Sequence, residues 1–219
     1  MRNIIATAVA LLTMLWIASC AQKKGSVASS KSISADRTFT DARDKKTYKT
    51  VKIGEQTWMA ENVNYSVSGS KCYDNKPDNC EKYGRLYHWG TAMKACPSGW
   101  HLPSKEEWQA LVDFAGGYKV AGKKLKAVSG WNDYEGKSSN GTDIYGFSAL
   151  PGGTGHSSGG NFSGVGITGM WWNSSEYRWS GSEVSSGRAY YAHIYYNNEH
   201  VYWHDDYKDI GLSVRCLKD

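Results

Sequence analysis

The feature that most limits what this 219-residue chain can fold into is its set of five cysteines. Cys20 ends an apolar N-terminal stretch, and four more follow it: Cys72, Cys80, Cys96 and Cys216. An even number in an oxidising compartment predicts two disulfides, for which three pairings exist. Cys72 and Cys80 flank the turn-forming run Pro77-Asp78-Asn79, which favours a short crosslink that closes a hairpin. Cys96 and Cys216 then remain for a crosslink between an early helix and the last strand. A zinc site is the alternative, but no Cys-x2-Cys pair is present to support it.

The residues before Cys20 have the composition of an export signal. Arg2 supplies a positive charge, and Ile4–Ile17 is an uncharged and mostly apolar run. This run is shorter than the roughly 20 residues that a membrane-spanning helix needs. Ile17-Ala18-Ser19-Cys20 resembles the lipobox of bacterial lipoproteins, in which the cysteine thiol receives a diacylglycerol group. We therefore expect residues 1–19 to be a lipoprotein signal peptide and Cys20 to be the lipidated first residue of the mature protein. The alternative is an ordinary secretory signal that ends at a chance cysteine.

Two regions are expected after the signal. Residues 21–35 contain five serines, three lysines and no aromatic residue, a composition that cannot bury a core. We expect residues 20–35 to be a lipidated N-terminus and flexible linker, and residues 36–219 to form one ordinary domain. Several acyl chains on one cysteine would hold this domain stably on a membrane.

The aromatic content is unusually rich in residues that carry a polar group. The chain has 10 Trp and 15 Tyr but only 4 Phe. Trp and Tyr suit half-buried surfaces and ligand contacts as well as cores. The net charge is +5, but the basic residues are scattered, and three of them lie in the linker. Because no basic stripe interleaves with the aromatic residues, we expect no nucleic-acid partner.

Short runs at both ends of the domain predict strands, and two helices are expected between them. The strand-like runs are Thr38–Thr40, Tyr48–Ile53, Thr57–Ala60, Trp171–Ser174, Arg188–Tyr195, His200–Trp203 and Gly211–Leu217. The first helix places Trp89, Ala92, Met93 and Cys96 on one apolar face. The second follows a capping box at Ser104–Glu107, buries Trp108, Leu111, Val112 and Ala115, and stops at Gly116-Gly117.

The stretch Ser129–Gly169 is mostly Gly, Ser, Asn and Asp, with one strand-like piece at Gly146–Leu150. A loop of this length inside a domain is usually functional or belongs to a fold built around loops. The expected fold class is α+β, with two helices, an antiparallel sheet and a long loop region.

Five blocks of sequence resemble the Fibrobacter succinogenes major paralogous domain, and the likeness extends from Phe39 to the end of the chain. The blocks are Thr47–Tyr65, Tyr83–Trp108, Gly146–Gly153, Trp171–Tyr177 and Gly211–Cys216. That family is similar to the C-type-lectin-like superfamily, which implies two helices, a twisted antiparallel sheet and a long loop region. The superfamily's core disulfide maps onto Cys96 and Cys216, the pair already reached from cysteine spacing. Members of the family are typically exported or lipid-anchored.

Two activities of related families find only partial matches in this sequence. Calcium-dependent lectins use Glu-Pro-Asn and Trp-Asn-Asp tripeptides. Trp131-Asn132-Asp133 occurs here, but upstream of the position expected for the lectin motif, and Glu-Pro-Asn is absent. The block His101–Trp108 resembles one in formylglycine-generating enzymes. Those enzymes need a reactive cysteine pair in the C-terminal part, where this chain has only Cys216. A formylglycine-generating-type enzyme is kept as an alternative function.

Three shorter matches lack the context that their chemistry needs. Gly155–Gly159 fits the G-x-S-x-G pattern without the strand and helix of a nucleophile elbow. Gly164–Gly169 fits G-x-G-x-x-G without a βαβ unit. His200 and His204 would stand about 13 Å apart on a strand, too far for one metal ion. We expect no catalytic residue, cofactor or metal.

The aromatic run near the C-terminus is the remaining candidate for function. Aromatic rings can stack on sugar faces, although about half of these rings should pack in the core, because alternate strand positions face inward. The candidate ligand-binding residues are Trp179, Tyr177, Trp172 and Trp171, with Trp179 the least explained by packing. We expect a non-catalytic binding module, lipid-anchored at the outer membrane or cell surface, for a polysaccharide or an envelope protein. A structural or assembly component of the cell envelope is the further alternative.

Overall fold

The computed structural model describes residues 37–156, 160–179 and 186–219, all within the compact unit Ile33–Asp219. The expected signal peptide, Cys20 and the linker lie outside the described residues, as do residues 157–159 of the G-x-S-x-G match. No helix of the described ranges is long and apolar enough to cross a membrane.

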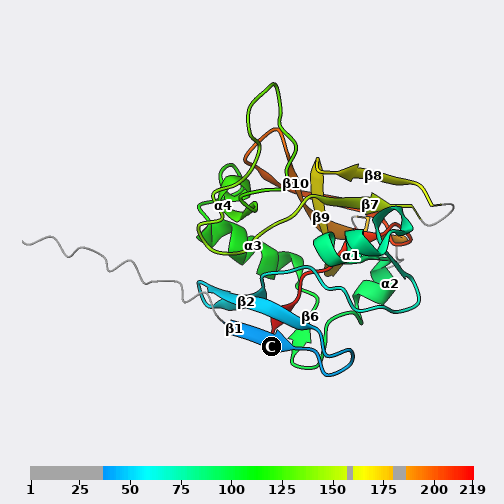
Figure 1. The fold of residues 1–219 in the computed structure, drawn as a ribbon. Helices are drawn as coiled ribbons and strands as arrows, with labels where there is room; N and C mark the ends of the chain where they lie inside the picture. Colours follow the sequence, from blue (N-terminus) through cyan, green and yellow to red (C-terminus); the bar gives the residue numbers. More distant parts are fainter. Residues whose placement is uncertain (1–36, 157–159, 180–185) are drawn as a thin grey trace, which may run out of the picture. The chain divides into compact units, whose positions relative to one another are not determined.

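Two antiparallel sheets form the framework of the domain (Figure 1). The first has the strand order β1-β2-β3-β13-β6 and contains the strands expected near the start of the domain. Its strands are β1 (Arg37–Thr40), β2 (Thr47–Ile53), β3 (Gln56–Met59), β6 (Trp100–His101) and β13 (Leu217–Lys218).

The second sheet has the order β11-β10-β9-β12-β5-β4, and only its β12–β9 contact is parallel. Its strands are β4 (Ser70–Lys71), β5 (Leu86–Tyr87), β9 (Thr168–Glu176), β10 (Arg188–Tyr195), β11 (Val201–Tyr207) and β12 (Leu212–Ser213).

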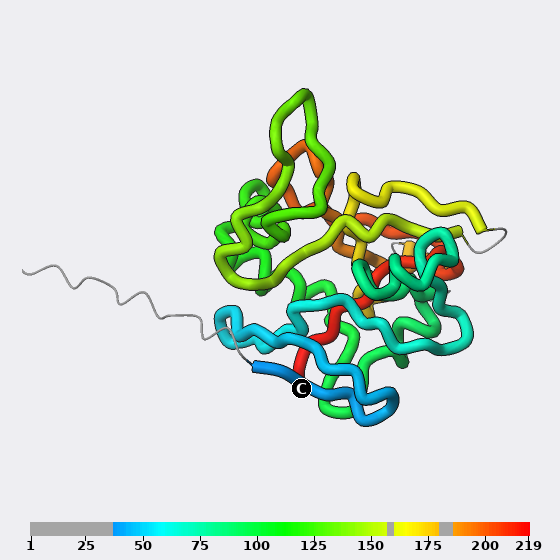
Figure 2. The backbone as a smooth tube through the Cα atoms, in the orientation of Figure 1, coloured from blue at the N-terminus to red at the C-terminus, as the bar shows by residue number. Residues whose placement is uncertain are grey.

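The end of the chain joins the two sheets. The stretch Gly211–Leu217, expected to be one strand, is two: β12 pairs in the second sheet and β13 in the first (Figure 2). The residues between them cross from sheet to sheet, and their carbonyls accept hydrogen bonds from the backbone of Met59 and Val63. Cys216 lies in this crossing and is bonded to Cys96, 120 residues earlier.

Four α-helices and one 3-10 helix are present in the described ranges, where two helices were expected. They are η1 (Tyr73–Asn75), α1 (Pro77–Tyr83), α2 (Trp89–Ala92), α3 (Lys105–Phe114) and α4 (Ala121–Leu125). The capping box of α3 is confirmed, because the Ser104 hydroxyl accepts from the Glu107 amide while the Glu107 carboxylate accepts from the Ser104 amide.

Two local predictions were wrong in detail. The Cys72–Cys80 disulfide is present, but Pro77 begins helix α1 and does not form a hairpin turn. Proline suits this position, because the backbone N–H of the first helical residue has no acceptor within the helix and can be absent without loss of a hydrogen bond. Helix α2 ends at Ala92, and the tighter turns that follow leave Met93 43% exposed, although it was expected on the buried face.

The long region after Ser129 has more order than its composition suggests. It contains a hairpin of β7 (Gly152–Gly155) and β8 (Phe162–Val165). Gly146–Leu150, by contrast, is not a strand. Ser148 has a left-handed backbone (φ 53°), held by hydrogen bonds from its amide and hydroxyl to the Asp143 carboxylate, and this conformation interrupts extended chain.

A buried lysine holds this loop region to the second sheet. The Lys126 ammonium donates to the carbonyls of Ser139 (3.3 Å), Tyr196 (2.9 Å) and Asn198 (2.9 Å). It also lies 4.7 Å from the centroid of the Trp131 ring. Burial lowers the pKa of Lys126 to about 8, so the side chain is still mostly charged at neutral pH. The Lys126 ammonium thus links the loop that contains Ser139 to the turn between β10 and β11, which contains Tyr196 and Asn198.

The core consists of two clusters on opposite sides of the second sheet. Trp58, Trp108 and Trp171 lie in the first, where the Trp58–Trp108 ring centroids are 5.0 Å apart and those of Trp108–Trp171 are 6.0 Å apart. Trp172 and Tyr191 lie in the second cluster. Helix α3 contributes Trp108 to the first cluster. This ring contacts Trp58 of the first sheet and Trp171 of the second, so α3 packs against both sheets. Mixed α+β architecture is confirmed.

Candidate functional site

Trp171 and Trp172, both expected to bind ligand, are core residues. Each is 0% exposed, because β9 lies inside the second sheet and consecutive side chains enter the two opposite core clusters. Their indole nitrogens are also used internally. Trp171 donates to the Asn62 side-chain oxygen and Trp172 to the Tyr87 carbonyl, each at 2.8 Å. A ligand on the surface does not reach either ring.

Trp179 and Tyr177 lie instead at the surface, just past the end of β9. Trp179 is 64% exposed, the largest exposed fraction of any tryptophan in the described ranges. Its ring packs edge-on against Tyr177 with centroids 5.8 Å apart, and Tyr177 packs edge-on against Tyr190 of β10 at 5.4 Å. We call Tyr177, Trp179 and Tyr190 the aromatic patch. Tyr177 and Trp179 follow β9 and Tyr190 belongs to β10, and the Tyr177 ring contacts the other two.

The aromatic patch continues into an open groove along helix α3. The Lys105 ammonium lies 4.1 Å from the centroid of the Tyr190 ring and also lines the groove. The groove holds about 310 Å³, and its lining residues are Lys105, Glu106, Gln109, Ala110 and Asp113. We call this the α3 groove. A ligand could therefore contact rings at one end and hydrogen-bonding groups at the other.

Two polar groups of the α3 groove, Gln109 and Asp113, are held in place by hydrogen bonds. The Gln109 amide nitrogen donates to the Asp113 carboxylate at 2.8 Å, and its oxygen accepts from the Trp203 indole at 3.0 Å. Trp203 packs against the first core cluster, which anchors Gln109. Fixed amide and carboxylate groups beside aromatic rings are suited to binding hydroxyl groups.

Hydrogen bonds also fix the backbone around the aromatic patch. The Tyr177 amide donates to the Arg188 carbonyl at 3.1 Å, and the Tyr177 carbonyl accepts from the Ser186 hydroxyl at 2.5 Å. Arg188 forms a salt bridge with Asp205 of β11 at 2.5 Å. These contacts hold Tyr177 beside Tyr190.

A ladder of aromatic and imidazole rings occupies the opposite face of β10 and β11. Tyr191 is paired with His204 and His193 with Tyr202, and the His193–His204 ring centroids are 5.5 Å apart. Burial, and then the charge of His204, lower the pKa of His193 to about 4.

His200 and His204 are the two histidines whose spacing was compared above with that of a metal site. His200 bonds to the Tyr202 hydroxyl at 2.9 Å. Within the described ranges, no group of three or more His, Cys, Asp or Glu side chains is arranged to hold a metal ion.

Of the tripeptide that matches a calcium-lectin motif, Trp131 is buried, whereas Asn132 and Asp133 are exposed. Trp131 is 4% exposed, and its indole donates to the Ala149 carbonyl at 3.0 Å. The Asn132 amide donates to the Gly166 carbonyl at 2.8 Å, which fixes the turn between β8 and β9. The G-x-G-x-x-G match runs from β8 through this turn into β9, and the positive φ of Gly164 and Gly166 accounts for those glycines.

Comparison with known families identifies the chain. The family described as the Fibrobacter succinogenes major domain matches residues 51–218, about three quarters of the sequence. The chain belongs to this family. No curated protein and no solved structure shows significant similarity to it. The matched residues of this Fibrobacter succinogenes major domain include the aromatic patch, the α3 groove and both disulfides.

Sequence reasoning counted Tyr190 only among the aromatic residues near the C-terminus, and it did not propose Tyr190, Lys105 or Gln109 as ligand-binding residues. Two local signals could have found the first two. Tyr190 alternates with the buried Tyr191 along β10, so it faces the other side of the sheet. Lys105 is the first residue after the capping residue of α3. Their proximity to Tyr177 depends on the packing of α3 against β9 and β10, which no local pattern contains.

Proposed function

We propose that this domain is a non-catalytic binding module and that its aromatic patch and α3 groove bind a polysaccharide. The observation that carries the proposal is the exposed Trp179 ring, which is continuous through Tyr177 and Tyr190 with a groove of fixed polar groups. Trp179 is exposed while Tyr177 and Tyr190 are half-buried, and clustered rings that reach the surface commonly mark an interaction site.

The chemistry of the site suits a sugar chain. Sugar rings have apolar faces that stack on aromatic rings, and their hydroxyls take hydrogen bonds from amides and carboxylates. The α3 groove supplies Gln109, Asp113 and Glu106 for such bonds and Lys105 for a ligand carboxylate or hydroxyl. Acidic and basic groups both line it, so binding does not require a charged polysaccharide.

We also propose the finer identity and placement of the domain. A C-type-lectin-like fold is supported by the α+β architecture and by the Cys96–Cys216 crosslink between an early segment and the end of the chain. Lipid anchoring at Cys20, and display at the outer membrane or cell surface, are supported by the leader sequence. A tether of this kind would present the aromatic patch to envelope or extracellular glycans.

The rival functions find less support in the described residues. A formylglycine-generating-type enzyme needs a reactive cysteine pair, whereas all four cysteines from Cys72 onward are in disulfides. A protein partner or an assembly role in the envelope would also use an exposed patch.

A glycan array, followed by pull-down on purified cell-wall and envelope polysaccharides, tests the proposal on the full chain in detergent. We expect binding to at least one polysaccharide, and binding that survives a calcium chelator, because Glu-Pro-Asn is absent from the sequence and the Trp131 indole is buried and bonded to the Ala149 carbonyl. Blank arrays together with a specific protein crosslink in the intact envelope would favour the assembly role. Loss of glycan binding on chelation would contradict the proposed mechanism.

A further inference from the structure

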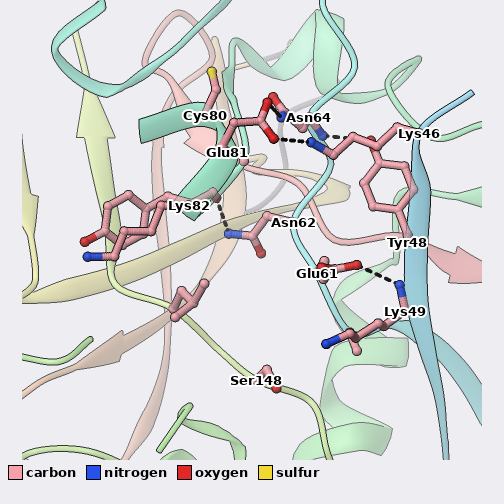
Figure 3. A pocket seen from close by; sticks show the side chains of 14 residues that line it. Lys46, Tyr48, Lys49, Glu61, Asn62, Asn64, Cys80, Glu81, Lys82 and Ser148 are labelled. Atoms are coloured by element: carbon pink, nitrogen blue, oxygen red, sulfur yellow. Dashed lines mark hydrogen bonds and ion pairs between the residues drawn. The ribbon is translucent and has the colours of Figure 1, made fainter. Parts of the chain in front are cut away.

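A cavity of about 200 Å³ lies between the first sheet and helix α1 and shares no lining residue with the α3 groove or the aromatic patch (Figure 3). Polar groups on its walls bond to one another: Glu81 accepts from the Lys46 ammonium at 2.9 Å and from the Asn64 amide at 3.1 Å. These bonds lie within the protein and account for that part of the polar lining. An exposed group that the fold does not account for lies instead beside the aromatic patch.

Tyr207 is the most exposed tyrosine of the described ranges, with 59% of its surface exposed. It ends β11, which is the outermost strand of the second sheet and pairs only with β10. No other strand of the described ranges therefore covers the outer edge of β11 at Tyr207. The ring is nevertheless held in a defined place, because the Arg188 guanidinium lies over it, 4.7 Å from the ring centroid.

The Arg188 guanidinium over Tyr207 is itself fixed by Asp205. Its Nε donates to the Asp205 carboxylate at 2.5 Å, and its Nη2 donates to the Asp205 carbonyl at 2.8 Å. Because a cation over a ring face attracts the ring, this contact orders Tyr207 before any ligand arrives. A ring that is ordered in advance loses little conformational freedom on binding, which favours affinity.

Tyr207 and the aromatic patch lie on one face of the second sheet, on either side of Arg188. The Tyr177 amide donates to the Arg188 carbonyl, whereas Tyr207 is the partner of Arg188 in β11. Adjacent strands are about 4.8 Å apart, so the backbones of Tyr177 and Tyr207 flank Arg188 at about 10 Å from each other. Tyr190 shares this face, because it is opposite Asp205, to whose carboxylate Arg188 donates.

From this arrangement we infer that Tyr207 is a second ring-stacking subsite of the binding face, and that this face takes several consecutive units of a sugar chain. The inference rests on the polysaccharide function proposed above. One unit stacks on the aromatic patch, and a later unit of the same chain reaches Tyr207 across Arg188, because the separation exceeds the width of one sugar ring. The contribution of Tyr207 therefore requires a chain long enough to cover both places.

A length series tests the inference on the full chain in detergent. The probes are oligosaccharides of two to eight units, made by partial acid hydrolysis of the polysaccharide that binds most tightly on the glycan array, and isothermal titration measures their affinities. We expect the affinity to rise with length and to level off once a chain covers both the aromatic patch and Tyr207. An affinity that is the same at all lengths would overturn the inference and leave the proposed function standing. A blank array would contradict the proposed function itself, and this inference with it.

Matched variants locate the subsite. Tyr207→Ala should weaken binding of the longest oligosaccharide about tenfold, the effect of losing an aromatic anchor, and weaken binding of the disaccharide much less. Tyr207→Phe keeps the ring and should bind like the wild type. Tyr118→Ala is the control and should leave all affinities unchanged, because Tyr118 is 51% exposed and its carbonyl bonds to Val201 at the opposite end of β11. Thermal unfolding of each variant should stay close to that of the wild type, as for other surface substitutions. Equal affinity of Tyr207→Ala and the wild type for the longest oligosaccharide would refute the subsite.

Discussion

Trp179 and Trp108 are two tryptophans of this domain with opposite surroundings, and their substitution separates binding from folding. Trp179 is 64% exposed, whereas Trp108 is 0% exposed among the rings of the first core cluster. Trp179→Ala should change the free energy of unfolding by less than about 1 kcal/mol, as surface substitutions usually do. It should weaken polysaccharide binding by about 1–3 kcal/mol, the effect of losing an aromatic anchor.

Trp108→Ala is the control for this experiment and should destabilise the fold by about 3–5 kcal/mol through the cavity it leaves. Urea denaturation and binding to the polysaccharide found on the array measure the two effects. If Trp179→Ala unfolds the domain, the ring belongs to the structure and the proposed binding face is wrong.

His193 should make the fold sensitive to mild acid. Its pKa is lowered to about 4, chiefly by burial, whereas an exposed histidine has a pKa of about 6.5. Between these values the unfolded chain binds a proton that the folded chain does not, so stability falls as the pH falls. The loss should reach at most about 3 kcal/mol below the folded pKa. Urea denaturation near neutral pH and near pH 4 measures it, and His193→Gln should show a smaller difference. An equal pH dependence in both proteins would assign the effect to other groups.

At the scale of one element, helix α3 is the best test of what local sequence contributes. Ser104→Ala removes the hydroxyl that accepts from the Glu107 amide and should destabilise the domain by about 1 kcal/mol. Glu107→Gln is the comparison, because glutamine keeps the reciprocal bond to the Ser104 amide but loses the charge beside His101. Thermal unfolding should place Glu107→Gln closer to the wild type than Ser104→Ala. The reverse order would show that the charge, and not the cap, stabilises this end of α3.

For the whole molecule, the two disulfides should contribute unequally. Cys96–Cys216 closes a separation of 120 residues and Cys72–Cys80 one of only eight. On the chain-entropy argument, replacing the first pair by alanine should cost about 5 kcal/mol and replacing the second about 2–3 kcal/mol. Denaturation of the two double variants gives the comparison. Equal losses would mean that strain or contacts in the folded state, and not loop closure, determine the stabilisation.

The anchor is also a property of the whole molecule. Cys20→Ser removes the proposed lipidation site, so the protein should move from the detergent phase to the aqueous phase in a phase-partition experiment. Intact-mass analysis of the wild type should show an acylated N-terminal Cys20. An unmodified Cys20 or cleavage at another residue would contradict the anchor.

The sequence by itself determined the features that depend on neighbouring residues. The capping box of α3, the extended runs of β2 and β10, and the mixed α+β class follow from contacts within a few residues. The pairing of the cysteines followed from their number and spacing, because one short pair left only one long pair. The family resemblance is confirmed over residues 51–218 by the same blocks of sequence.

Only the tertiary structure decided which aromatic rings reach solvent. Trp171, Trp172 and Trp179 lie within nine residues of one another, yet two are in separate cores and one is exposed. The burial of each ring depends on which side chains cover that face of β9. Val51 and Trp108 are in the cluster that buries Trp171, and Tyr87 is in the cluster that buries Trp172, and all three are far away in the sequence. The same holds for the buried Arg215, which bonds to Asn62, and for Lys126 between its two loops. Contacts across such separations are set by how the sheets and helices pack, so no local pattern could have shown them.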